Sequence, residues 1–216
     1  MTTDGGNQVY DVVIDSAARI QAGEFQAVVV CGAETLRTRR ADRRQGRSST
    51  YLPEREGAEP DETLGVGGKM TNEREETVGL RAASTFYAMA ETALRHRLGE
   101  DLDAHRRRVA ELWARASRVA ADNPAAWTRA ALDADDIATE SASNRPITSP
   151  YPKLMTSNLD VDQGGAVIVC SVATAEAAGV PTDRWVFPWA GASATDPWFA
   201  TNRWAFDESP GMQLAS

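Results

Sequence analysis

Apolar residues recur at helical spacing near the start of the chain and then give way to a short continuous run. Between residues 9 and 22 they return every three or four positions, which predicts an amphipathic helix with Asn7 as its N-cap and Gly23 after its end. The run 27–31 reads Ala-Val-Val-Val-Cys, a pattern typical of a strand buried on both faces of a parallel sheet. A helix followed by such a strand is the second half of a right-handed βαβ unit, whose first strand we expect before residue 1.

A second segment repeats this pattern later in the chain. Residues 166–171 read Ala-Val-Ile-Val-Cys-Ser and match 27–32 in pattern, and helix-forming residues 173–178 with Gly179 follow. We therefore predict that both runs lie in one buried sheet. A third short strand is predicted at 184–187.

The region between the two runs is predicted to be mostly helical. Six arginines fall between Arg37 and Arg47, ahead of a Gly-, Pro- and Glu-rich stretch, so we expect residues 36–73 to form a surface loop with about one helical turn. The helix expected after residue 101 has Val109, Leu112 and Trp113 on one apolar face. An insertion of roughly 120 residues is longer than an ordinary loop and implies a lid or subdomain. Helices are predicted over 75–98, 102–121, 125–132 and 135–140.

Composition and charge exclude several classes of protein. Hydrophobic residues make up 42% of the chain and charged residues 25%, which is typical of a soluble globular protein. The formal net charge of −8 disfavours nucleic-acid and membrane-surface partners. No apolar run approaches the ~18 residues of a membrane span, and the N-terminus lacks the pattern of a signal peptide. With only two cysteines, far apart, we expect a cytoplasmic protein without a disulfide framework or a zinc site.

The last residues predict a helix that begins and soon stops. Ser209 is a suitable N-cap and Pro210 suits the first helical position. The chain ends about one turn later, which is too short for a helix that is stable by itself. Together with the strand expected before residue 1, this predicts an internal piece of a longer protein.

The residues with catalytic potential are each explained better by a structural role. Cys31 and Cys170 close runs of valines, where we expect them to be buried and inaccessible. His96 and His105 stand beside arginines near helix ends, which favours solvated residues over a catalytic base. The acidic segment 158–169 lacks the glutamate that closes a calcium loop, and there is no nucleophile elbow, dinucleotide fingerprint or phosphate loop.

Two clusters leave alternatives open. The arginine run fits a solvated face, an anion site for a phosphorylated cofactor or partner, or a nucleic-acid patch. The solvated face is favoured, because aromatic residues do not interleave with the arginines and the chain is acidic. The second cluster is a group of four tryptophans near the end of the chain, Trp185, Trp189, Trp198 and Trp204. It fits an interface between domains or subunits and equally the ordinary packing of an irregular segment.

Several stretches resemble the thiolase family. Ile20–Glu34, IQAGEFQAVVVCGAE, resembles the part of a thiolase that follows its nucleophile loop. Tyr151–Ser171, YPKLMTSNLDVDQGGAVIVCS, resembles the segment that closes the loop domain and re-enters the sheet. Asn123–Trp127 and Asp183–Asp196 are most similar to the lipid-transfer-protein, or sterol-carrier, subfamily. The resemblance covers nearly the whole chain, whereas the chain covers less than half of such an enzyme.

This resemblance implies a fold and a division of the chain. The fold is a thiolase-like layered α/β/α arrangement, part of the N-terminal half with a large helical loop-domain insertion. Residues 1–35 would form the first part of the α/β core and 36–155 the insertion. Residues 156–216 would return to the core and begin the link to a C-terminal half. The implied partners are acyl-CoA and either further copies of the chain or a chain that supplies the C-terminal half.

The resemblance also implies an activity, an acyl-CoA acyltransferase that cleaves or condenses a 3-oxoacyl-CoA. When Gly23 and Glu34 are matched to the family's landmarks, Gly5–Asn7 stands where the acylated cysteine belongs. The family's histidine and second cysteine belong to the C-terminal half. We therefore assign no catalytic residue and expect the chain to be inactive alone. The alternatives are a thiolase-fold protein with other chemistry, of the steroid side-chain aldolase type, and a non-catalytic assembly subunit.

What the resemblance transfers to this chain is coenzyme A binding. The loop Thr156–Asp160 resembles the family segment that touches pantetheine, although the family's small Ala-Ser-Gly is not reproduced. Ser157 and Asn158 are accordingly the candidate binding residues. Coenzyme A or acyl-CoA is expected as a substrate, and no tightly bound cofactor or metal is expected.

Overall fold

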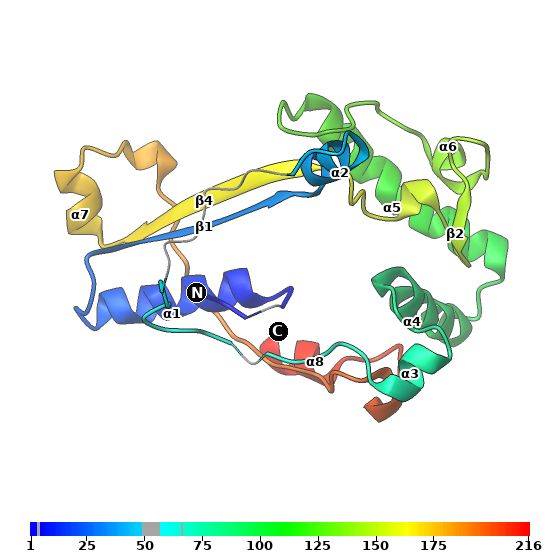
Figure 1. The fold of residues 1–216 in the computed structure, drawn as a ribbon, viewed down its shortest axis with the longest axis horizontal. Helices are drawn as coiled ribbons and strands as arrows, with labels where there is room; N and C mark the ends of the chain where they lie inside the picture. The colour runs from blue at the N-terminus through cyan, green and yellow to red at the C-terminus, as the bar shows by residue number, and fades with distance from the viewer. Residues whose placement is uncertain (4, 49–56, 66) are drawn as a thin grey trace. The chain divides into compact units, whose positions relative to one another are not determined.

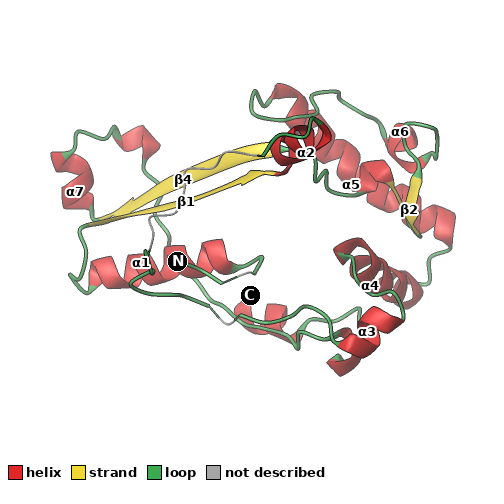
Figure 2. Ribbon diagram, in the orientation of Figure 1, coloured by secondary structure: helices red, strands yellow, loops and turns green. Residues whose placement is uncertain are grey.

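The structure is a computed structural model that describes residues 1–3, 5–48, 57–65 and 67–216 (Figure 1). The chain divides into two compact units. The first unit comprises Met1–Lys69, Asp160–Thr195 and Gly211–Ser216, and the second comprises Met70–Leu159 and Asp196–Pro210. Figure 2 shows that helices and loops predominate and that strands are few.

The first unit is built on a long two-stranded ribbon. Its helices and strands are α1 (Gln8–Gln21), β1 (Ala27–Thr35), α2 (Leu36–Arg44), β4 (Asp162–Cys170) and α7 (Val172–Ala177), with a 3-10 turn at Thr182–Arg184. A further helix, α8, spans Pro210–Ala215 and begins at the predicted proline. The predicted first helix is confirmed as α1, with Asn7 at its N-cap and Gly23 just past its end at a φ of +79°.

Strands β1 and β4 pair with each other, but the predicted parallel, buried arrangement is wrong. They run antiparallel in continuous register from Ala27↔Cys170 to Thr35↔Asp162. Most of their residues are exposed. The insertion between them is long enough to return the chain in either direction, so an apolar run by itself does not fix strand polarity.

One face of this ribbon is covered in part, since Val167 on it is still 52% exposed, and the other is bare. Val28, Val30 and Val169 share one face and are half-buried. Helix α1 contacts both strands, which places it against that face (Figure 1). On the opposite face Val29 is 62% and Ile168 is 70% exposed.

The second unit holds the hydrophobic core. Its elements are α3 (Glu73–Thr77), α4 (Ala83–Leu98), α5 (Leu102–Asp122), α6 (Ala134–Ala138), β2 (Pro146–Thr148) and β3 (Tyr151–Pro152), with 3-10 turns at Lys153–Met155 and Ala200–Asn202. Strands β2 and β3 form a short antiparallel pair. The core joins α5 to α6 and to the turn after β3; its buried members are Val109, Ala110, Ala114, Ile137 and Met155.

The predicted helices are confirmed in part. Helix α5 matches the prediction for 102–121 closely, and α6 is a shorter form of the one predicted for 135–140. The helix predicted for 75–98 is two helices, because the chain turns at Gly79 with a φ of +89°. Residues 125–132 are not helical. There the Asn123 side chain accepts from Ala125 N, and Ser117 Oγ donates to Ala130 O and accepts from Leu132 N.

Two predictions about surface segments are wrong. Residues 36–44 form the helix α2 rather than a loop with one turn, while part of the Gly- and Pro-rich stretch after it lies outside the described residues. Residues 184–187 are not a strand: Pro181 and Pro188 flank them, and Val186 is 90% exposed, with no neighbouring strand to pair with among the described residues. Within the described residues, no helix combines the length and the apolar character needed to cross a membrane.

Candidate functional site

The predicted coenzyme A loop is an exposed turn at the edge of the second unit. It follows the 3-10 turn Lys153–Met155, and Ser157, Asn158 and Leu159 are all exposed. Met155, two residues before Ser157, is buried in the core. The loop therefore leaves a fixed point in the core and presents its polar side chains to solvent.

A buried asparagine fixes the start of this loop. Asn144 is almost fully buried, and its side-chain oxygen accepts from Leu154 N at 2.8 Å. Its amide nitrogen donates to the carbonyl oxygens at the end of α6, at 3.0 Å to Ile137 and 2.8 Å to Thr139. Carbonyl groups at a helix end lack partners within the helix, so this one side chain closes α6 and ties it to the loop.

Tyr151 provides a second anchor ahead of the loop. Its hydroxyl donates to Glu91 Oε2 at 2.9 Å, which joins β3 to α4. Burial raises the pKa of Tyr151 above its ordinary value, and the bond to Glu91 raises it further. The hydroxyl therefore remains a hydrogen-bond donor at neutral pH.

The same glutamate belongs to a buried polar cluster around His105. The prediction of a solvated helix-end histidine is wrong for His105, which is fully buried, whereas His96 is exposed as predicted. His105 Nε2 lies 2.8 Å from Glu91 Oε1, and its Nδ1 lies 2.6 Å from Glu100 Oε2. Both ring nitrogens of His105 are thus occupied by carboxylates, and Arg108 Nη2 lies 3.2 Å from its Nδ1, so the cluster is structural and leaves no free ring nitrogen to act as a catalytic base.

Glu100 completes this cluster at the turn between α4 and α5. Arg108 Nε donates to Glu100 Oε1 at 2.8 Å. The Arg108 hydrogen bond lowers the pKa of Glu100, burial opposes it, and the His105 bond adds to the lowering, so the net shift is downward. Glu100 is thereby held as a carboxylate between two donors.

The other end of the loop is fixed within the first unit. Arg40 of α2 forms an ion pair with Asp160. The Thr38 hydroxyl donates to Asp162 Oδ2 at 2.7 Å, and this hydrogen bond holds the pKa of Asp162 below its usual value. Arg47 pairs with Asp42. The arginine run is thus an exposed helix whose pairs fix neighbouring segments, in agreement with the favoured solvated face.

Neither cysteine belongs to this loop. Cys31 lies on the bare face of β1 and is exposed, whereas Cys170 at the end of β4 is half-buried. The prediction that both cysteines are buried is therefore wrong for Cys31. It fails because no described element covers that face. Gly5–Asn7 leads into α1, where Asn7 Nδ2 donates to Asp11 Oδ2 at 2.8 Å. In the described part of the chain, no group of three or more His, Cys, Asp or Glu side chains is placed to hold a metal ion.

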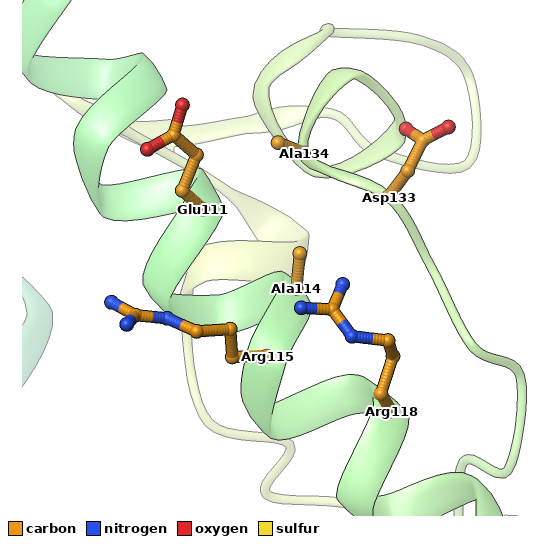
Figure 3. Close-up of a pocket in the computed structure, with 6 residues that line it drawn as sticks. All are labelled: Glu111, Ala114, Arg115, Arg118, Asp133 and Ala134. Carbon is orange, nitrogen blue, oxygen red and sulfur yellow. The ribbon is translucent and has the colours of Figure 1, made fainter.

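A hollow of about 360 Å³ lies between α5 and the start of α6 (Figure 3). Arg118 extends toward the Asp133 segment, while Arg115 leaves α5 on the other side. Asp133 is occupied as the N-cap of α6 and accepts from Asp136 N at 2.8 Å. The lining has charges of both signs and no nucleophile or histidine, and it does not include the loop residues. We assign no chemistry to it.

Comparison with known proteins finds matches among the solved structures. No family model matches the chain, and no curated protein matches it. The crystal structure of a monomeric SCP2-thiolase-like protein type 1 from Mycobacterium smegmatis matches with a TM-score of 0.70 and 29% sequence identity. The match covers 98% of this chain and 38% of that chain.

The match confirms the predicted fold class. This chain has the thiolase-like α/β fold of an SCP2-thiolase-like protein, with a helical insertion between two strands of its sheet. It spans about two fifths of the length of the matched protein.

Sequence reasoning missed the anchors Asn144, Tyr151 and His105. For His105 a signal existed, since it stands four residues before Val109 on the same face of α5.

Proposed function

We propose that this chain is the coenzyme A-binding part of a thiolase-like acyl-CoA acyltransferase, which cleaves or condenses a 3-oxoacyl-CoA. The observation that supports it is the match of 98% of the chain to an SCP2-thiolase-like protein at a TM-score of 0.70. Because the chain spans 38% of that protein, the proposal for the residues of this chain is limited to coenzyme A binding.

Within this proposal, the exposed loop supplies the contacts. The Ser157 hydroxyl and the Asn158 amide offer donors and acceptors of the kind that the two amides of pantetheine require. Asn144 and the buried Met155 hold the start of the loop, so little conformational entropy is lost when a ligand binds there. In this proposal the loop positions the thioester substrate through its coenzyme A part.

One observation favours a second candidate function. Gly5–Asn7, in the place of the family's nucleophile, has no thiol. A thiolase-fold protein that cleaves steroid side chains as an aldolase would bind acyl-CoA at the same loop without an acyl-enzyme. A trapped acyl-cysteine in the active enzyme, measured by mass spectrometry, distinguishes the acyltransferase from this alternative.

The binding proposal is tested by titrating coenzyme A into the purified chain in a calorimeter. We expect Ser157→Ala and Asn158→Ala each to weaken binding by about two- to tenfold, the effect of one lost hydrogen bond. Gln21→Ala removes a comparable exposed amide at the end of α1 and serves as the matched control. Absence of binding, or equal effects in all three variants, would refute the assignment of the loop.

The inactivity of the isolated chain is tested separately. Purified chain incubated with acetoacetyl-CoA and coenzyme A is expected to give no acetyl-CoA above background. Turnover that persists after repeated purification, and that disappears on Cys31→Ala, would instead place the nucleophile in this chain.

A further inference from the structure

Helix α2 concentrates positive charge on the surface of an acidic chain. Residues 36–47 contain six arginines and a single acidic residue, Asp42, whereas the whole chain has a formal net charge of −8. Clustered surface charges of one sign raise the local concentration of ligands of the opposite sign. This segment is therefore suited to an anionic ligand, unlike the chain as a whole.

The arginines of α2 lie on one side of the helix. At 3.6 residues per turn, all five fall within an arc of about 160° around the helix axis, and Thr38, Ala41 and Asp42 occupy the remaining arc. The Thr38 hydroxyl donates to Asp162 of β4 at 2.7 Å, so the side without arginines is turned toward the ribbon. The arginine side is turned outward; its members are Arg37, Arg39, Arg40, Arg43 and Arg44.

Several contacts fix α2 to the segment that leads into β4. Arg37 N donates to Val161 O at 3.4 Å, and Arg40 forms an ion pair with Asp160. Just past the end of the helix, Arg47 pairs with Asp42 at 2.9 Å. The arginine side therefore belongs to an anchored helix, which lowers the conformational entropy that a ligand loses by ordering its site.

Two arginines of the last turn are not used by these contacts. Arg43 and Arg44 are exposed, and neither has a carboxylate partner in the part of the chain that the structure describes. Arg40, one turn earlier, lies between them on the helix surface. A guanidinium group offers paired N–H donors that match two phosphate oxygens, and such charge-assisted hydrogen bonds are stronger than neutral ones.

We infer that the outward side of α2, at Arg40, Arg43 and Arg44, binds the phosphate groups of a small ligand. We call these three residues the α2 arginine patch. The identity of the ligand rests on the proposed function, because the adenosine end of coenzyme A carries a diphosphate and a 3′-phosphate. A free diphosphate has the same chemistry, and the experiment below separates these two sources.

The test is calorimetric titration of the purified full chain with adenosine 3′,5′-bisphosphate. We expect the bisphosphate to bind and adenosine, which lacks phosphate, not to bind. Arg43→Gln combined with Arg44→Gln should weaken binding at least about tenfold, because charge-assisted hydrogen bonds are lost from both positions. Raising the salt concentration should weaken binding to the parent chain, since the patch is exposed.

Two further variants serve as controls. Arg115→Gln combined with Arg118→Gln removes the same charge from exposed positions of α5, and it should change the affinity by less than about twofold. Arg43→Lys combined with Arg44→Lys keeps the charge but loses the paired donors, so it should give an intermediate loss of affinity. Lysine also keeps the favourable interaction of basic residues with the helix dipole, so this loss would not come from a destabilised helix.

The source of the phosphate is identified by comparing coenzyme A with 3′-dephospho-coenzyme A and with inorganic diphosphate. If coenzyme A occupies the patch, removal of its 3′-phosphate weakens binding to the parent and has no effect in the Arg43→Gln, Arg44→Gln variant. If diphosphate binds at the patch while this variant leaves the affinity for coenzyme A unchanged, the phosphate site stands and coenzyme A is excluded as its ligand.

Three results would overturn the inference. They are absence of bisphosphate binding, equal weakening in the α2 and α5 glutamine variants, and much tighter binding of a single-stranded oligonucleotide through the same arginines. Pantetheine, which has no phosphate, separates this test from that of the loop. Bisphosphate binding without pantetheine binding supports the patch and refutes the loop, whereas pantetheine binding alone supports the loop and refutes the patch.

Discussion

His105 is held between carboxylates on both sides of its ring. The cluster links α4 through Glu91, the following turn through Glu100 and, by way of Tyr151, the strand β3. Because every member is buried or half-buried and hydrogen-bonded, removing one leaves polar groups without partners.

We expect His105→Gln to lower the melting temperature by roughly 5–10 °C. Glutamine cannot donate to both carboxylates, so at least one of Glu91 and Glu100 loses a donor inside the cluster. His96→Gln is the matched control, since His96 is exposed on α4 and should shift the melting temperature by only about 1–2 °C. Equal shifts in the two variants, measured by differential scanning calorimetry, would contradict a structural role for the cluster.

Glu75 gives the second unit a defined acid sensitivity. Burial alone would raise the pKa of this carboxyl, but hydrogen bonds from Thr201 N at 2.7 Å, Asn72 N and the Thr201 hydroxyl lower it below its ordinary value of 4.5. A carboxyl whose pKa is lower in the folded than in the unfolded state contributes stability that is complete above the unfolded pKa. That contribution is lost as the pH falls through the folded pKa.

We therefore expect the melting temperature of the chain to fall steeply below about pH 4.5 and that of Glu75→Gln to fall less. The variant should already be less stable at pH 7, since its amide presents hydrogens toward groups that donate. Glu73→Gln, two residues earlier and exposed, is the control and should follow the parent. Parallel pH profiles for the parent and Glu75→Gln would contradict this role.

At the scale of the element, a close approach holds the Pro- and Gly-rich segment 185–195 against α1. A Cβ built on Gly191 would lie 2.4 Å from Ile14 Cγ1, so any side chain there displaces the segment or the isoleucine. We expect Gly191→Ala to destabilise the chain by about 1–3 kcal/mol, as overpacking does. Gly32→Ala in β1 is the control for the added methyl group, because its Cβ would meet no atom within 4 Å.

The mechanism of this destabilisation is tested by a double-mutant cycle. Ile14→Ala makes room for the new methyl group, so Gly191→Ala should cost less in that background than in the parent. Urea unfolding curves measure the four free energies of unfolding. Strict additivity would show that the two residues do not interact.

Elements were predictable where local signals suffice and unpredictable where distant partners decide. Helix α5 begins as expected, because Asp101 supplies its N-cap and accepts from Ala104 N. Its buried face differs from the apolar stripe: Leu112 and Trp113 are exposed, while His105 and Ala114 are buried. The contacts with α6 and α4 determine which face of α5 is buried, and the local spacing of residues does not specify those contacts.

The candidate site was likewise predictable only in part from the sequence. The exposed loop at Ser157 and Asn158 was found by resemblance to a family, and whether it binds coenzyme A stays a prediction. Its anchors were not predictable, because Asn144 meets Leu154 and Tyr151 meets Glu91 only after the chain has folded. The polarity of β1 against β4 was likewise decided by the path of the intervening insertion.

At the scale of the whole molecule, stability is distributed unevenly between the two units. The second unit contains the buried cluster around Val109 and Ile137, whereas the ribbon of the first unit leaves a face and two edges open. Local opening requires less free energy where few apolar contacts and many exposed backbone hydrogen bonds occur. The chain is therefore not expected to unfold as one cooperative body.

Hydrogen–deuterium exchange of the isolated chain tests this expectation. Amides of α5 from Val109 to Ala114 should exchange at least about tenfold more slowly than those amides of β1 that are hydrogen-bonded to β4. The amides of α1, which packs on the ribbon, should exchange with those of β1. Uniform exchange rates across α5 and β1 would mean that the two units open together. The bare face would then not lower the free energy of local opening in the isolated chain.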